Sequence, residues 1–314
     1  MLLLIARRLL VTIPLLILVS FLIYSLIALV PGDPAVTLAG QDPTPEQIAA
    51  AREELGLTDP FIVQYWHWLV NAVQLDFGAS LFNSEPVASA IAARLPATLS
   101  LTVLALLIAI LLGVAAGTLA GLRPGSWIDR VATFSASVGV AVPYFWVGMI
   151  LVLLFAIQTP LFPAIGYVPI GDGVLTWASH LILPATALAI APAAVIARQT
   201  RAAVANVMTE DYVRTAEAKG LPRSRVVGKH ALKNAALPVV TVFGIEANRL
   251  IGGTVVIEQL FAIPGVGQLA FTSVFSRDMP MVQGVLLTTA VLILLINLLV
   301  DVSYGYFNPR VRQL

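Results

Sequence analysis

Residues 212–222 read Tyr-Val-Arg-Thr-Ala-Glu-Ala-Lys-Gly-Leu-Pro, a charged stretch between two long apolar segments. Those segments, 181–203 and 237–257, each have roughly the 20 mainly apolar residues that a transmembrane helix needs. The sequence therefore predicts a membrane protein in which residues 205–236 form a loop on one side of the bilayer.

Composition supports this assignment and excludes several kinds of site. Of the 314 residues, 59% are hydrophobic and only 11% are charged, whereas soluble domains carry about a quarter charged residues. The absence of cysteine excludes disulfides, thiolate metal sites and cysteine nucleophiles. A net charge of +1 gives no reason to expect a nucleic-acid partner.

Six stretches have the length and apolarity of membrane-spanning helices. They are 9–29, 97–121, 131–157, 181–203, 237–257 and 282–304. We expect Pro143 to interrupt the third and Pro192 the fourth, because proline removes a backbone donor. The first run is too long for a signal peptide and no A-x-A-like site follows it, so we expect it to be retained. The expected fold is an all-α integral membrane protein with six transmembrane helices.

The placement of lysine and arginine predicts the orientation of these helices. Only Arg52, Arg94 and Arg277 fall on one side, Arg249 lies within a span, and all the others fall on the opposite side. The positive-inside rule therefore places both termini in the cytosol of a multi-pass protein of the plasma membrane. The expected parts are an N-terminal segment with the first span (1–30), an extracytoplasmic segment with short helices (31–96), a core transmembrane domain of five helices (97–304) and a cytosolic tail (305–314).

The external segment carries local helix signals. Thr44 and Gln47 form a capping box and Gly56 suits a helix stop, so 45–55 is expected to be a short helix. The stretch 61–75 is amphipathic and rich in aromatic residues, which favour the headgroup level of a membrane. It could lie along the outer interface or pack on the protein's own spans.

The cytosolic loop 205–236 carries signals for two consecutive helices. Thr209 can cap the first helix, Asp211 suits its positive end, and Gly220 can supply a left-handed stop. Pro222 can open a second helix that runs to about Leu237. Such a pair could transmit displacement to the next span, or it could be an ordinary basic loop.

This loop resembles the coupling motif of permease subunits in bacterial ABC importers, in the form found in the dipeptide/oligopeptide branch. The positions that fit are Tyr212 to Gly220, His230 to Leu232, Asn234 and Pro238. Glu217 stands where arginine is common in that branch, and Lys233 replaces an arginine. Of the more general importer motif, only Ala216, Gly220 and Leu232 match.

Further stretches in the same order extend the resemblance over nearly the whole chain. They are Pro31-Gly32-Asp33-Pro34; Leu55-Gly56-Leu57 with Pro60 and Val63-Gln64-Tyr65; Asp76-Phe77-Gly78 with Ser80; Arg94 to Leu99; Pro143 with Phe145-Trp146 and Gly148; and Glu258, Phe261 and Pro264-Gly265 with Gly267. The chain thus resembles the permease B type of the binding-protein-dependent transport system inner membrane component family.

The resemblance implies a pore-forming half of an importer in a prokaryotic plasma membrane. The implied partners are a second homologous permease subunit, two ATPase subunits, an extracytoplasmic peptide-binding protein and membrane lipid, with no nucleic acid. The implied ATPase-coupling residues are Asp211, Tyr212, Arg214, Thr215, Ala216, Lys219, Gly220 and Leu221. The implied mechanism is alternating access, and the implied cargo is a dipeptide or oligopeptide. Glutathione, a nickel complex or haem are alternatives.

The chain lacks a G-x-x-x-x-G-K-[ST] phosphate loop. We therefore expect ATP and Mg²⁺ to be bound by the partner subunits and this chain to hold no cofactor and no metal. It is expected to be a translocation subunit and not an enzyme, since neither an H-E-x-x-H motif nor a cysteine nucleophile is present. A secondary carrier is a weaker alternative, because no internal repeat of the kind found in many carriers is visible.

Three polar residues in the fifth span, Glu246, Asn248 and Arg249, are candidates for the translocation pathway. Ionisable groups within a membrane are costly unless they are paired or face water. Glu246 and Arg249 are three residues apart and could pair on one helix face. They could therefore line the pathway for zwitterionic cargo or simply neutralise each other.

Two further sets of residues complete the candidate sites. Glu258, Phe261, Pro264 and Gly265 follow the fifth span on the predicted outer side, where a tight turn is expected. They could form an outer gate with Phe261 as an apolar plug, a contact for the binding protein, or a passive re-entrant turn. The glycines of the second span, Gly113, Gly117 and Gly121, recur every four residues, which favours close helix packing.

Overall fold

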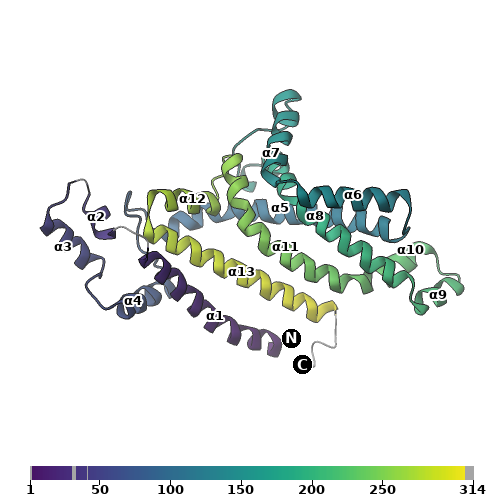
Figure 1. Cartoon of the computed structure of the whole chain (residues 1–314), viewed down its shortest axis with the longest axis horizontal. Coiled ribbons are helices and arrows are strands. Elements are labelled where there is room, and N and C mark those ends of the chain that lie inside the picture. The colour runs from purple at the N-terminus through teal and green to yellow at the C-terminus, as the bar shows by residue number, and fades with distance from the viewer. Residues whose placement is uncertain (1, 30–32, 41, 308–314) are drawn as a thin grey trace. The chain divides into compact units, whose positions relative to one another are not determined.

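The computed structural model describes residues 2–29, 33–40 and 42–307, and this part of the chain is mainly helical (Figure 1). The helices are α1 (Leu2–Ala28), α2 (Pro34–Ala39), α3 (Pro45–Glu54), α4 (Phe61–Val73), α5 (Val87–Gly121), α6 (Trp127–Ala141), α7 (Tyr144–Val152), η1 (Leu153–Gln158), η2 (Ile170–Asp172), α8 (Val174–Met208), α9 (Asp211–Ala218), α10 (Arg223–Arg225), η3 (Val226–Leu232), α11 (Lys233–Leu260), α12 (Val266–Ser276) and α13 (Met279–Phe307). Residues 308–314 of the predicted tail and the Pro31-Gly32 pair lie outside the described residues.

The chain forms two compact units, which are described separately. Among the described residues, the first unit contains 2–6 at the start of α1, Ala97–Ile263 and the C-terminal part of α13 from Leu295. The second unit contains Arg7–Pro96 and Pro264–Leu294. The helices α1, α5 and α13 contribute residues to both units.

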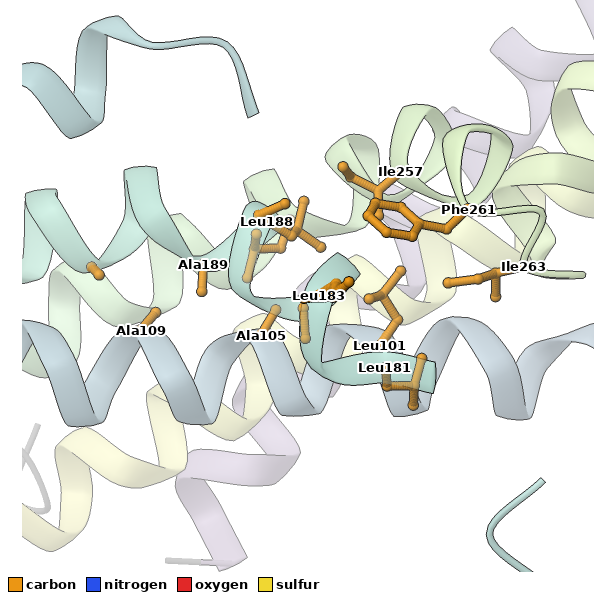
Figure 2. Close-up of a cluster of buried hydrophobic side chains, with 14 of the residues drawn as sticks. Leu101, Ala105, Ala109, Leu181, Leu183, Leu188, Ala189, Ile257, Phe261 and Ile263 are labelled. Carbon is orange, nitrogen blue, oxygen red and sulfur yellow. The ribbon is translucent and has the colours of Figure 1, made fainter. Parts of the chain in front are cut away.

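The core of the first unit forms around α8. In the most apolar stretch of α8, 67% of the residues are buried, compared with 39% in the corresponding stretch of α11. On α5 the buried residues Ala97, Leu101, Ala105 and Ala109 recur every four positions, so they share one helix face. Figure 2 shows this face meeting Leu181 and Leu188 of α8, Ile257 of α11, and Phe261 directly after α11.

The three glycines of α5 lie where that helix touches α8, as the sequence predicts. A Cβ atom at Gly117 would lie 2.4 Å from the carbonyl oxygen of Ala197. At Gly113 and Gly121 the corresponding distances to backbone oxygens of α8 are both 2.8 Å. Only glycine permits such close contact between the backbones of α5 and α8, because it has no side chain to keep them apart.

The predicted spans are found with differences in number and length. Four of the described helices are long and apolar enough to cross a membrane: 87–121, 174–208, 238–260 and 279–303. A fifth span results if α6 and the helix 144–158 are taken together. The first predicted span, 9–29, coincides with most of α1, whose described apolar part includes Leu10–Leu26.

The proline predictions have different outcomes. At Pro143 the third span divides into two helices bent by 100°, a much sharper change than a kink. Val142 is extended there, as expected for a residue before proline. The helix α8 continues through Pro192 and through Pro184, so neither proline divides the fourth span, and a kink at Pro192 stays a prediction. Both prolines are buried among neighbouring helices, where local adjustments can satisfy the freed backbone groups.

The second unit contains the predicted external helices. Thr44 and Gln47 form the predicted capping box at the start of α3. Gly56 follows α3 with a φ of +64°, so the predicted stop is also confirmed. The start of the second span is corrected, because α5 begins at Val87, ten residues before position 97, and includes Pro96.

The helix α4 packs on α1 by its aromatic side chains. The Tyr65 hydroxyl lies 2.9 Å from Ser20 Oγ and donates to the carbonyl oxygen of Ile17 at 3.1 Å. The ring centroids of Tyr24 and Trp68 are 5.5 Å apart. The opposite face of α4 exposes Trp66, so the structure supports packing on the protein's own helix for one face only.

Candidate functional site

The helix α9 (Asp211–Ala218) ends in a well-defined C-terminal motif. Gly220 has a φ of +76°, its amide donates to the carbonyl oxygen of Glu217, and the amide of Leu221 donates to that of Ala216. These two bonds form a Schellman motif, in which glycine accommodates the left-handed residue. The prediction that Gly220 stops this helix is therefore confirmed.

The start of α9 differs from the prediction. Glu210 occupies the N-cap position, without a side-chain hydrogen bond to the helix. The Thr209 hydroxyl instead donates to the carbonyl oxygen of Asn206, in the last turn of α8, at 2.7 Å. Thr209 is thus part of the preceding helix end, and the prediction that it caps α9 is wrong.

One face of α9 is buried against its neighbours in the first unit. Val213 is 1% exposed and Ala216 8%, and they pack with Val226 of η3. Val207 and Met208, at the end of α8, and Leu221 complete this cluster. The helix α9 therefore shares apolar contacts with the end of α8 and with η3.

The other face of α9 is polar and exposed. Arg214 and Asp211 are paired at 3.7 Å, with side chains 71% and 98% exposed. The exposed ring of Tyr212 carries a hydroxyl that accepts a hydrogen bond from Asn234 Nδ2 at 2.9 Å, which connects α9 to α11. The implied coupling residues therefore divide into two sets: Asp211, Tyr212, Arg214, Thr215, Lys219 and Gly220 are exposed, whereas Ala216 is buried and Leu221 is half-buried.

The second helix of the loop is continuous with the membrane span. It begins after Pro222 as α10, becomes the π-helix η3 at Val226, and continues as α11 through Pro238. The predicted boundary at Leu237, between the second loop helix and the fifth span, is therefore not a helix end. A π-helical segment widens the helix by one residue per turn and often marks a functional position.

A partly buried ion pair joins α6 to α8, and sequence reasoning did not identify it. Asp129 accepts hydrogen bonds from Nε and Nη2 of Arg201, the latter at 2.7 Å, and from the amide of Gly125 at 2.9 Å. The Asp129 side chain is only 6% exposed. Asp129 lies three residues after Ser126, whose hydroxyl caps α6. This spacing was the feature of the sequence that could have drawn attention to Asp129.

In the fifth span the candidate pathway residues form two polar pairs. Nη1 of Arg249 donates to Oε1 of Glu246 at 2.8 Å, and their side chains are 68% and 5% exposed respectively. Neutralisation within the helix, one of the two alternatives, is therefore present. The Arg249 side chain is nevertheless mostly exposed, and its role in the pathway stays a prediction.

Asn248 pairs with a residue that sequence reasoning missed. Its Nδ2 donates to Oδ1 of Asn297 on α13 at 2.6 Å. One helix turn away, a Cβ at Gly244 would lie 2.8 Å from Val300, so α11 and the C-terminal part of α13 are closely packed here. The sequence did show that Asn297 is a polar residue within an apolar span. Such residues commonly form hydrogen bonds between membrane helices, so Asn297 could have been singled out on this ground.

The candidate outer residues Glu258 and Phe261 are buried in the first unit. Glu258 is 0% exposed and accepts a hydrogen bond from Thr98 Oγ1 of α5 at 2.7 Å. Phe261 is 1% exposed and points into the core with Ile257 and Ile263 (Figure 2). Its role as a plug stays a prediction, and any such role requires the ring to leave this core.

The turn after α11 lies earlier than predicted. Ala262 has a φ of +49°, and the amide of Ile263 donates to the carbonyl oxygen of Glu258 at 2.9 Å. The chain then runs extended through Pro264 and Gly265 before α12 begins. The prediction of a tight turn at these two residues is wrong, because a helix C-terminal motif reverses the chain first.

The sequence of the chain matches known protein families and individual relatives. Residues 109–313 match the family described as binding-protein-dependent transport system inner membrane component, and residues 1–102 match its N-terminal companion. The "Probable peptide ABC transporter permease protein y4tP" of Sinorhizobium fredii is 44% identical over 309 residues, covering 98% of both chains. The glutathione transport system permease protein GsiC of Escherichia coli (strain K12) is 41% identical over 306 residues, covering 98% of this chain and 97% of that one.

A solved structure has a related fold. The chain is similar to one in the inward-facing MetNI methionine ABC transporter, with a TM-score of 0.57 and 19% identity. The similarity covers 69% of this chain and 96% of that chain. At this identity the comparison concerns the fold alone.

Proposed function

The chain belongs to the family of binding-protein-dependent transport system inner membrane components, and on this premise we propose that it forms half of the pore of an ATP-driven importer of short peptides. The observation that carries the proposal is the construction of α9. This helix ends in a Schellman motif, packs one face on α8 and η3, and presents its other face to solvent.

We propose that the exposed face of α9 receives a separate ATPase subunit. In this mechanism, movement of the ATPase displaces α9, and the cluster around Val213 passes the displacement to α8 and, through η3, to α11. The bond between Tyr212 and Asn234 supports the same coupling. Alternation between outward and inward openings then follows from tilting these two helices.

The proposed assembly contains a second homologous permease subunit, two ATPase subunits and an extracytoplasmic binding protein in a prokaryotic plasma membrane. Both termini of this chain are cytosolic in this proposal. The exposed guanidinium of Arg249 supports a role for α11 in the pathway, because a zwitterionic peptide carries a carboxylate that it can meet. Peptide cargo is supported by the name of the 44% identical relative.

The test compares two arginine variants in the purified complex. Arg214→Glu reverses a charge on the exposed face of α9, whereas Arg123→Glu reverses a charge in the exposed loop before α6, on the same predicted side. We expect Arg214→Glu to lower copurification of the ATPase subunits and ATP-driven uptake of a labelled tripeptide by roughly tenfold, as for loss of a charged interface contact. Arg123→Glu should leave both the copurification of the ATPase subunits and the uptake of the tripeptide unchanged.

Two outcomes would contradict the proposal. Equal uptake by both variants would show that α9 is not the docking element. Uptake by the chain alone, driven by an ion gradient without nucleotide, would identify a secondary carrier instead.

Glutathione is a second candidate cargo. The 41% identical relative is named for glutathione transport, and its coverage of this chain equals that of the peptide relative. Competition of unlabelled glutathione against the labelled tripeptide distinguishes the two, since only a glutathione importer would prefer it.

A further inference from the structure

The helix α4 has an apolar face that is exposed in its own unit and that the proposed transport mechanism does not use. Four residues of this helix follow one another at spacings of four, three and four positions, so they lie on one side of it. These residues, called the apolar stripe below, are Ile62, Trp66, Leu69 and Val73. The side chains of Ile62, Trp66 and Val73 are 63%, 61% and 77% exposed, and Leu69 is half-buried. An apolar surface of this kind requires a partner.

The side of α4 opposite the apolar stripe is polar and is bonded to the loop before the helix. It carries Gln64, His67 and Asn71, which again share one side because they are three and four positions apart. Nε2 of Gln64 donates to the carbonyl oxygen of Asp59 at 2.7 Å, and Nδ1 of His67 lies 3.9 Å from Oδ2 of Asp59. The sequence of Phe61–Val73 contains no aspartate, glutamate, lysine or arginine. The helix is therefore amphipathic, and its two sides differ in polarity and not in charge.

The contact between α4 and α1 indicates the depth at which α4 lies. The Tyr65 hydroxyl is bonded to Ser20 Oγ and to the carbonyl oxygen of Ile17, and the ring centroids of Tyr65 and Tyr24 are 5.8 Å apart. Ile17 and Tyr24 precede the end of α1 at Ala28 by eleven and four residues. At 1.5 Å per residue the contact therefore lies roughly 6–17 Å from that end. The hydrocarbon layer of a bilayer is about 30 Å thick, so a contact at this distance falls in the outer half of the layer if α1 crosses it as proposed.

At the same level α1 is itself apolar towards its surroundings. Leu18, Leu22 and Leu26 recur every four residues and are 54%, 50% and 63% exposed. Both helices of this contact thus expose apolar side chains at a depth where lipid surrounds a membrane helix. The helix α4 has 13 residues, which span about 20 Å and cannot cross the layer. A short amphipathic helix at this level is expected to lie along the membrane surface, and an exposed tryptophan favours the headgroup level.

We propose that α4 binds the outer surface of the phospholipid bilayer. The apolar stripe lies among the lipid chains just below the headgroups, and the side with Gln64, His67 and Asn71 faces water. Because α4 carries no lysine or arginine, apolar burial alone drives this contact, and it does not depend on anionic lipid. The inference rests on the membrane placement of α1 in the proposed function, but it requires neither ATP nor cargo.

The test uses single cysteines that carry a nitroxide spin label, since the chain has no cysteine of its own. Ile62→Cys and Val73→Cys place the label on the apolar stripe. Asn71→Cys places it on the polar side of the same helix, and Glu46→Cys places it on the exposed surface of α3. The full chain is reconstituted in phosphatidylcholine nanodiscs. Paramagnetic resonance then measures the accessibility of each label to oxygen, which enters lipid, and to a nickel chelate, which stays in water.

We expect the ratio of oxygen accessibility to nickel accessibility to be roughly fivefold higher at positions 62 and 73 than at positions 71 and 46, because an interfacial helix buries its apolar face about 5–10 Å into the boundary of the acyl chains. Replacing part of the phosphatidylcholine by phosphatidylglycerol should leave these ratios unchanged. The substituted side chains at 62 and 73 are exposed, so the labelled variants should fold as the unmodified chain does. ATP-driven uptake of the labelled tripeptide by each variant in the complex checks this.

Two results would overturn the inference. Equal ratios at all four positions would show that the apolar stripe faces water. Labels at 62 and 73 that become shielded from both reagents when the complex is assembled would show that a partner protein covers the stripe. Either result leaves the proposed function standing if the complex still takes up the tripeptide with ATP. High ratios at 62 and 73 in a complex that shows no ATP-driven uptake would support the lipid contact and refute the proposed function alone.

Discussion

Replacing Gly117 by alanine tests the contact between α5 and α8 directly. The added methyl carbon would lie 2.4 Å from the carbonyl oxygen of Ala197, 2.6 Å from Cβ of Thr200 and 3.0 Å from the amide nitrogen of Arg201. Nonbonded carbon contacts are favourable near 3.5–4.0 Å, so the nearest contact is short by about 1 Å. Two of the three atoms are backbone, and a rotamer change cannot move them.

The helices must therefore separate, and the expected cost is that of overpacking a core. Such insertions cost about 1–3 kcal/mol, and each kcal/mol lowers the melting temperature by roughly 2–4 °C in a chain of this size class. We expect Gly117→Ala to melt roughly 2–12 °C below the unmodified chain. The assay is thermal unfolding of purified protein in mild detergent, followed by intrinsic fluorescence.

The matched control is Gly252→Ala in α11. A Cβ at Gly252 would meet no atom within 4 Å. Alanine is favoured over glycine in a helix interior by about 0.5–1 kcal/mol, so this variant should melt at or slightly above the temperature of the unmodified chain. If Gly117→Ala melts no lower than Gly252→Ala, the close approach of α5 and α8 is refuted.

Three further predictions concern charged residues. Glu246→Gln should reduce peptide uptake and leave Arg249 unpaired while the complex still assembles; unchanged uptake would remove Glu246 from the pathway. Asp129→Asn should lower the free energy of unfolding by about 1.5–3 kcal/mol, the range for hydrogen bonds to charged groups. The measurement is the denaturation midpoint, and an unchanged midpoint would contradict a stabilising role for the pair of Asp129 and Arg201. The hydrogen bond from Arg52 at 2.5 Å is the main cause that lowers the pKa of the Asp33 carboxyl. The contact between α2 and α3 should therefore be complete above about pH 4, the unfolded value, and be lost as pH falls through the lower folded pKa. Amide protection factors of α2, corrected for the intrinsic exchange rate, that are equal at pH 7 and at pH 2 would exclude this dependence.

Local sequence signals predicted the helix ends well. The capping box at Thr44 and the stops at Gly56 and Gly220 are confirmed because they depend on residues only a few positions apart. Thr209 is the exception, since its hydroxyl bonds to the helix before it and not to the one after it. A capping residue between two helices can serve either, and its neighbours decide which.

The candidate site was predicted only in part. The charged pair in the fifth span was visible because Glu246 and Arg249 are three residues apart on one helix. The pair formed by Asp129 and Arg201 was not, because 72 positions separate the two residues in the chain. Asn297 likewise acquires its significance only from Asn248 on another helix.

The sequence alone therefore determined the class of the molecule, the approximate positions of its apolar helices and the ends of its short helices. Apolar length and capping chemistry are properties of neighbouring residues, so they can be read from one segment at a time. The tertiary structure alone decided the 100° bend at Pro143, the burial of Phe261 and the partners of Asp129. These features depend on which helix faces meet, and packing between distant segments determines that.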